Sequence, residues 1–157
     1  MSTVTNAQIL DAIESAAREA AVFGAITRSG SRLVCAASGS ASPAEYAVEA
    51  SNDGWRLSLG TADRWLSESI ESSLVESRDS MDDLFREALL DMGSTVEPPR
   101  IRHFRDEAKR YVFEALIPGN PGDAEAAAKL QLFLLAFESM FRLLGDMDTD
   151  MDGDPEG

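Results

Sequence analysis

The sequence has 157 residues, with 28 acidic and 14 basic side chains and a formal net charge of −14 at pH 7. This acidity repels phosphate backbones and anionic lipid surfaces, which argues against nucleic acids and membrane surfaces as partners. The length fits a single domain, and a hydrophobic content of 44% is ordinary for a globular protein. Cys35 is the only cysteine, so an intrachain disulfide and a cysteine-based metal cluster are both excluded.

A first helix is predicted to begin at Thr5. Thr5 and Gln8 have the spacing of a capping box, in which each side chain bonds the other residue's backbone N–H. The helix ends between Ala20 and Gly24. Its inward face is rich in alanine, which allows close approach to a neighbour; the face consists of Ile9, Ile13, Ala16, Ala17 and Ala20.

Between Ala25 and Leu59 the hydrophobic pattern changes to the alternation of half-buried strands. We expect an antiparallel meander of three or more strands, with one face toward helices and a tight hairpin turn at Asn52-Asp53-Gly54. Cys35 lies in an apolar context, which favours a buried small hydrophobe over a reactive thiol. Turn-forming residues separate four short runs: Ala25–Arg28, Arg32–Ala36, Glu45–Ala50 and Trp55–Leu59.

Two helical segments are predicted next. The first runs from Ala62 to Glu76 with Thr61 as its N-cap, and Trp65 lies at the edge of its apolar stripe. The second runs from Met81 to Met92, after Asp79 or Ser80 as N-cap, and Gly93 ends it. Its apolar residues recur at i, i+3, i+4, i+7, i+8 and i+11, which is typical of one buried helix face.

A second β-hairpin is predicted after Pro98-Pro99, from Arg100 to Arg105 and from Lys109 to Ile117. It carries five of the 14 basic residues, which form either a docking patch for an acidic partner or phosphate, or a charged sheet edge that discourages aggregation. We favour the sheet edge. His103 is the only histidine, and no nucleophile or acid stands beside it by spacing, so we expect a strand residue on a partly covered face. The basic residues are Arg100, Arg102, Arg105, Lys109 and Arg110.

The longest predicted helix runs from Asp123, as N-cap, to Gly145, in the C′ position. From Leu130 to Leu144, 11 of 15 residues are apolar and cover an arc of roughly 200°, against about 100° for an ordinary surface helix. The helix is therefore expected to touch a sheet on one side and something else on the other. It is too short and too charged for a membrane span. The residues that we expect to contact a partner are Trp65, Leu132, Leu135, Ala136 and Leu143.

Residues 146–157 form an acidic tail that we expect to be disordered. Asp148 to Gly153 match the opening of a calcium loop, but the glutamate required at its twelfth position would fall beyond Gly157, so we expect no metal site. The sequence contains no phosphate-binding glycine loop, nucleophile elbow or zinc-ligand spacing. No catalytic residue and no cofactor are therefore expected.

Together these elements predict one α+β domain over residues 1–145, an antiparallel sheet (meander plus hairpin) covered on one face by helices, in the order α-β-β-β-α-α-β-β-α. This order is similar to the type III secretion chaperone-like fold, which the bacterial YbjN-like family shares. The stretches that carry the resemblance are Trp55 to Trp65, Ile101 to Ile117 and Leu134 to Leu144. This chain departs from the pattern by its split middle helical region and its acidic tail.

The resemblance implies a small, acidic and usually dimeric protein that binds extended polypeptide segments along apolar patches. We therefore expect a non-enzymatic protein-binding module, secretion-chaperone-like or regulatory, that binds a polypeptide or forms a homodimer. No secretory leader is visible, so the expected setting is the cytoplasm. Two alternatives stay open: a small enzyme with dispersed carboxylates, and a purely structural domain whose wide helix is covered by the first helix.

Overall fold

The computed structural model describes residues 5–38, 40, 42–51, 54–78, 80–118, 124–145 and 147. Within these residues the chain forms four helices and six strands, which confirms the predicted α+β class and the order of elements, with four strands in the meander where the predicted order has three. The four predicted runs of the meander each form a strand. In chain order the elements are α1 (Asn6–Ala20), β1 (Phe23–Ser29), β2 (Arg32–Ala37), β3 (Ala44–Ser51), β4 (Gly54–Thr61), α2 (Arg64–Ser77), α3 (Met81–Asp91), β5 (Ile101–Arg105), β6 (Tyr111–Pro118) and α4 (Ala124–Arg142).

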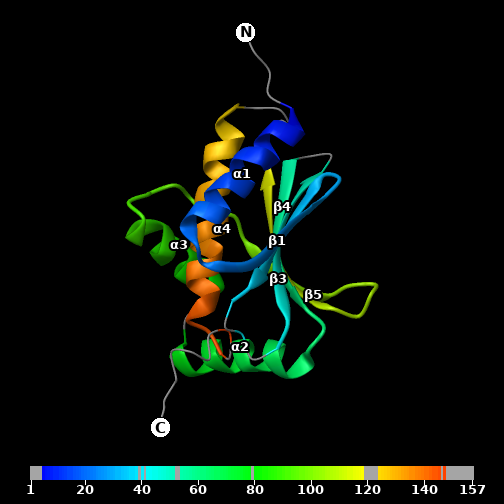
Figure 1. The fold of residues 1–157 in the computed structure, drawn as a ribbon. Coiled ribbons are helices and arrows are strands. Elements are labelled where there is room, and N and C mark those ends of the chain that lie inside the picture. The colour runs from blue at the N-terminus through cyan, green and yellow to red at the C-terminus, as the bar shows by residue number, and fades with distance from the viewer. Residues whose placement is uncertain are drawn as a thin grey trace.

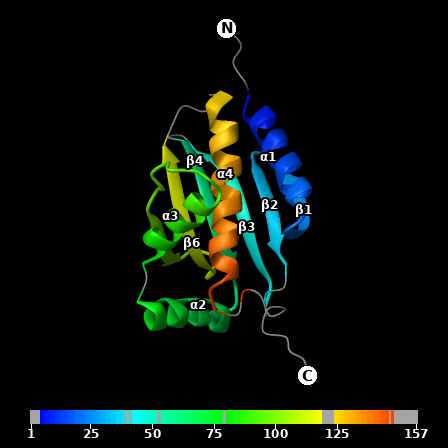
Figure 2. The same cartoon turned by 90° about the vertical axis from the view of Figure 1, so that its left-hand side faces the viewer.

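The strands form one antiparallel sheet in the order β1-β2-β3-β4-β6-β5. Figure 1 shows the helices on one side of this sheet, and Figure 2 shows α4 between α1 and α3, with α2 crossing one end. No helix of the described chain covers the opposite face, and the β5–β6 hairpin projects on that side (Figure 1). The predicted covering of one face is therefore confirmed.

The capping box that starts α1 is present. Thr5 Oγ1 accepts the Gln8 N–H at 3.1 Å, and Gln8 Oε1 accepts the Thr5 N–H at 2.8 Å. The buried face includes Leu10, which the predicted stripe omitted, while the predicted Ala16 is only half-buried. The fully buried residues of α1 are Ile9, Leu10, Ile13 and Ala17.

The N-cap of α2 is Asp63, so the prediction of Thr61 was wrong. Thr61 still pairs with Tyr111 as the last residue of β4, and its hydroxyl donates to the Pro43 carbonyl at 2.9 Å. The Asp63 carboxylate accepts the N–H groups of Trp65 at 2.7 Å and Leu66 at 3.2 Å. For α3, Ser80 is the N-cap, and the other candidate, Asp79, lies outside the described residues.

The Asp63 cap makes a pH-dependent contribution to stability. The hydrogen bond from Ser42 and those from the backbone of Leu66 and Trp65 lower the pKa of Asp63 below its ordinary value. A lowered carboxyl pKa stabilises the fold above the pKa of the unfolded state, and this stability is lost as pH falls through the folded pKa. Asp63→Ala should therefore be less stable than the wild type at neutral pH in urea unfolding, and the difference should shrink in acid. An equal difference at both pH values would contradict the assignment.

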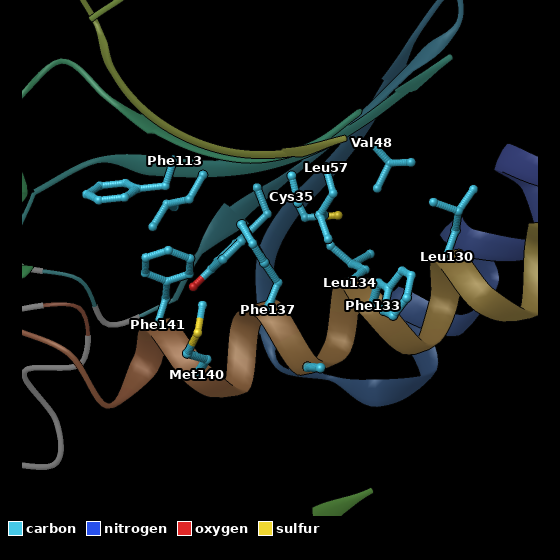
Figure 3. Close-up of a cluster of buried hydrophobic side chains, with 14 of the residues drawn as sticks. Cys35, Val48, Leu57, Phe113, Leu130, Phe133, Leu134, Phe137, Met140 and Phe141 are labelled. Atoms are coloured by element: carbon cyan, nitrogen blue, oxygen red, sulfur yellow. The ribbon is translucent and has the colours of Figure 1, made fainter. Parts of the chain in front are cut away.

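The core lies between the sheet and α4. Figure 3 shows Phe133, Phe137 and Phe141 of α4 directed toward the sheet, where Phe113 and Leu57 meet them. The ring of Phe137 lies 4.8 Å from that of Phe141 between centroids. Cys35 is 1% exposed in this core, and burial raises the pKa of its thiol to about 12, which confirms the prediction of a buried small hydrophobe.

Several predicted features lie outside the described residues. They include Asn52 and Asp53 of the first hairpin turn, the proposed N-cap Asp123, and the calcium-like motif from Asp148 to Gly153. Gly145 has a left-handed φ of +53°, which favours glycine, but it lies three residues after Arg142, so α4 ends earlier than the predicted C′ position implied. Met147, which follows it, is buried at 2% exposure against the core.

Candidate functional site

The outer face of α4 carries a continuous stripe at i, i+3, i+7 and i+11, made of Leu132, Leu135, Ser139 and Leu143. Leu132 and Leu135 are half-buried, whereas Leu143 is 67% exposed. Ala136 lies at the edge of this stripe, four residues from Leu132, but is fully buried in the core. Three of the four α4 residues that we expected at a partner surface therefore lie on one stripe, between α1 and α3 (Figure 2).

The stripe ends in a groove between α2, α3 and α4, with a volume of about 230 Å³. Apolar side chains from α3 and the end of α4 line most of it, and serines of α2 and α4 interrupt them. We call this the three-helix groove. Its lining residues are Ser73, Ser77, Leu84, Glu87, Ala88, Asp91, Ser139, Met140, Leu143 and Leu144.

Two carboxylates stand on the α3 rim of the three-helix groove. Glu87 and Asp91 are four residues apart and therefore lie on the same side of α3. Both are exposed, and neither forms an ion pair with a described residue. The groove thus combines an apolar lining with uncompensated negative charge at its edge.

Sequence reasoning identified both walls of the groove separately. The α3 residues Leu84 and Ala88 belong to the predicted buried stripe, and Leu143 belongs to the predicted partner surface. Nothing in the spacing showed that these two stripes end side by side. Trp65, the fifth predicted partner residue, is 76% exposed near the start of α2 and does not line the groove.

The basic hairpin is the edge of the sheet, since β5 is an outermost strand. Arg102 pairs with Glu114 at 2.6 Å and Arg110 with Glu45 at 3.0 Å. Arg100 lies 3.9 Å from Asp82, and Arg105 lies over the ring of Tyr111, 5.5 Å from its centroid. Lys109 adopts a φ of +64° in the turn. Intramolecular partners thus neutralise much of this positive charge.

His103 joins two residues that sequence reasoning did not connect with it. Its Nε2 lies 3.3 Å from Ser67 Oγ, and its Nδ1 lies 2.9 Å from Glu71 Oε2. The ring stacks on Phe113, with 3.9 Å between centroids. Ser67 and Glu71 share one face of α2 by their i, i+4 spacing, but 36 residues separate Ser67 from His103.

The order serine, histidine, carboxylate is that of a nucleophile, its base and an orienting acid. Here Ser67 is 2% exposed in the body of α2, and its N–H is held by the Asp63 carbonyl at 3.3 Å. Ser67 lines none of the three cavities described in this chain. The Ser67 hydroxyl is thus buried in the contact between two elements, and we interpret the cluster as a tie between α2 and β5.

The described part of the chain holds neither a metal-binding cluster nor a helix that could cross a membrane. No group of three or more histidine, cysteine, aspartate and glutamate side chains is arranged to hold a metal ion there. Nor does any described helix combine the length and hydropathy that crossing a bilayer requires. Comparison with known proteins adds nothing to these geometric findings, because no family model, no curated protein and no solved structure matches the chain.

Proposed function

We propose that this chain is a non-enzymatic protein-binding module whose three-helix groove receives a polypeptide segment with apolar and basic side chains. The observation that carries the proposal is the position of Leu143, 67% exposed beside an apolar groove with an uncompensated acidic rim. Full burial of one large apolar side chain contributes about 1.5–3 kcal/mol, so a few such contacts can support specific binding. The expected setting is the cytoplasm.

The chemistry of the rim favours a basic partner. Neither Glu87 nor Asp91 forms an ion pair with a described residue, since the neighbouring Arg86 pairs with Asp83 and Glu97, and the whole chain carries a net charge of −14. Complementary charge speeds association and rejects partners of the wrong sign. An amphipathic helix laid in a hydrophobic groove is a common mode of peptide recognition, with anchors at i, i+3, i+4 and i+7.

A direct test uses three designed 14-residue peptides that carry fluorescein. The first has leucines at helical spacing and lysines elsewhere; the second replaces each lysine by glutamate, and the third replaces each leucine by serine. Fluorescence anisotropy should show saturable binding of the first peptide alone. Leu143→Ser should weaken that binding about tenfold, which corresponds to about 1.4 kcal/mol. The double variant Glu87→Lys/Asp91→Lys should weaken binding of the first peptide more than Leu143→Ser does. Its remaining binding should depend less on salt concentration than that of the wild type.

Leu116→Ser is the matched control. Leu116 is 45% exposed on β6, on the opposite face of the sheet, so this variant should bind the first peptide like the wild type. Equal binding of the first peptide by the wild type and by Leu143→Ser would refute the groove as the site. Equal binding of the lysine and glutamate peptides would refute the role of the acidic rim.

Self-association is a second candidate for the same surface. The α4 stripe of Leu132, Leu135 and Leu143 runs along the outside of the molecule, and an isologous dimer needs one such self-complementary patch. Light scattering on the purified protein should then report twice the chain mass of 17.0 kDa, and Leu143→Ser should shift it toward a monomer. A monomer at high protein concentration would leave only the polypeptide-binding proposal.

A further inference from the structure

The face of the sheet opposite the helices carries a row of charged residues across three strands. Arg32 of β2 is directly paired with Glu49 of β3, and Glu49 is directly paired with Arg56 of β4. Paired residues on neighbouring strands point to the same face. The two guanidinium groups therefore stand on either side of one carboxylate, one strand away from it in each direction.

Next to this row the sheet surface forms a hollow of about 210 Å³, which we call the open-face hollow. Small residues of the two central strands, Ala47 and Ser58, belong to its lining. Ala47 is only 4% exposed although no described helix covers this face, so the surrounding longer side chains enclose it. The residues that line the hollow are Arg32, Ala47, Glu49, Arg56, Ser58, Phe104, Asp106, Val112 and Glu114.

The two arginines of the hollow differ from those of the nearby hairpin. Arg102 and Arg110 both pair with carboxylates, whereas neither Arg32 nor Arg56 forms an ion pair or a hydrogen bond through its side chain within the described chain. The Nε of Arg32 is, in addition, buried without a hydrogen-bond acceptor. A buried donor that lacks an acceptor is costly, and Trp55 Nε1 and Arg142 Nε share this state in the described chain. The observation specific to the hollow is the pair of guanidinium groups, those of Arg32 and Arg56, that have no carboxylate partner.

Three carboxylates line the hollow together with the two arginines, and none of them forms an ion pair with Arg32 or Arg56. Glu114 is neutralised by Arg102 at 2.6 Å. Asp106 accepts the Arg110 N–H at 2.9 Å and so serves the hairpin turn. Glu49 is the carboxylate that strand register places beside both arginines, and it forms no ion pair with either of them. The row itself therefore holds two cations and one anion, while Asp106 and Glu114 belong to the neighbouring hairpin.

We propose that the open-face hollow binds a small monocarboxylate with an apolar body. Its carboxylate lies between Arg32 and Arg56, because the planar guanidinium fork matches two carboxylate oxygens. Its apolar part rests against Val112 and Phe104, which supply the apolar wall of the hollow. A phosphate dianion is the weaker ligand, since the net charge of −14 and Glu49 repel its second charge.

The test titrates ¹⁵N-labelled protein with benzoate and follows backbone amide shifts by NMR. Saturable shifts are expected at β2, β3 and β4, with little response to the neutral analogue benzamide and a weaker response to inorganic phosphate. Arg32→Met should weaken benzoate binding at least tenfold. Glu49→Gln should strengthen it several-fold, because the competing carboxylate is removed.

Arg56→Met is a second variant of the same kind, and its exposed position leaves the core intact. Leu143→Ser, in the three-helix groove, is the matched control and should bind benzoate like the wild type, so this test is separate from the peptide test. Benzoate binding that is unchanged in both arginine variants would overturn the proposal. So would binding of benzamide as tight as that of benzoate.

Discussion

Replacing Phe137 by alanine should lower the free energy of unfolding by about 3–5 kcal/mol, the usual cost of removing a buried phenylalanine. Phe137 is fully buried, and its ring contacts three others edge-on: Phe85 at 5.5 Å, Phe141 at 4.8 Å and Tyr46 at 6.4 Å between centroids. These contacts join α4 to α3 and to β3. Their loss leaves a cavity where three parts of the fold meet.

Urea unfolding followed by circular dichroism measures this effect. Phe104→Ala is the matched control, since Phe104 is 36% exposed on the edge strand β5, where the Arg102 guanidinium lies over its ring. It should cost far less than Phe137→Ala. Similar losses from both variants would show that the interface of α4 with the sheet is not the principal core.

The second large effect is expected from Gly145→Ala at the end of α4. Gly145 has a φ of +53°, and a Cβ at this position would lie 2.5 Å from Ser69 Oγ, 2.6 Å from the Ser69 carbonyl carbon and 2.7 Å from the Ile70 N. Two of these atoms belong to the backbone of α2 and cannot rotate away. The variant must therefore displace α2 or the end of α4, with an overpacking cost of about 1–3 kcal/mol in addition to the left-handed strain.

Gly93→Ala separates the two costs. Gly93 has a φ of +84°, and nothing lies within 4 Å of a Cβ built there, so its variant reports the backbone strain alone. Thermal unfolding of both variants should give a clearly lower midpoint for Gly145→Ala. Equal midpoints would mean that α2 and the end of α4 can move apart at little cost in the free energy of unfolding.

The elements of this fold were predictable because their signals are local. The capping box of Thr5 and Gln8, the 3.6-residue period of α3 and the alternation in β3 and β4 each depend on neighbours in sequence. The apolar arc of α4 correctly indicated two kinds of contact. The sheet takes one side, and α1 and α3 take the flanks.

The sites were less predictable because each depends on residues distant in sequence. The three-helix groove needs the ends of α2, α3 and α4 to meet, and no spacing encodes that meeting. Ser67 meets His103 only after α2 crosses the end of the sheet beside β5. Arg32 and Arg56 become neighbours of Glu49 only through strand register, which turn geometry and hydrophobic pattern set jointly. The N-cap of α2 was wrong for a related reason, since strand pairing holds Thr61 in β4.

The place of α4 along the chain has a consequence for synthesis on the ribosome. The apolar side of the sheet, with Leu57 and Phe113, is made from β-strands that are all translated before α4. Until Phe133, Phe137 and Phe141 leave the exit tunnel, no helix covers the centre of the nascent sheet. A nascent chain whose residues up to 118 have left the exit tunnel, while the α4 segment is still inside it, should therefore expose this surface and be recognised by general chaperones. Release of the α4 segment should end that exposure in a single step.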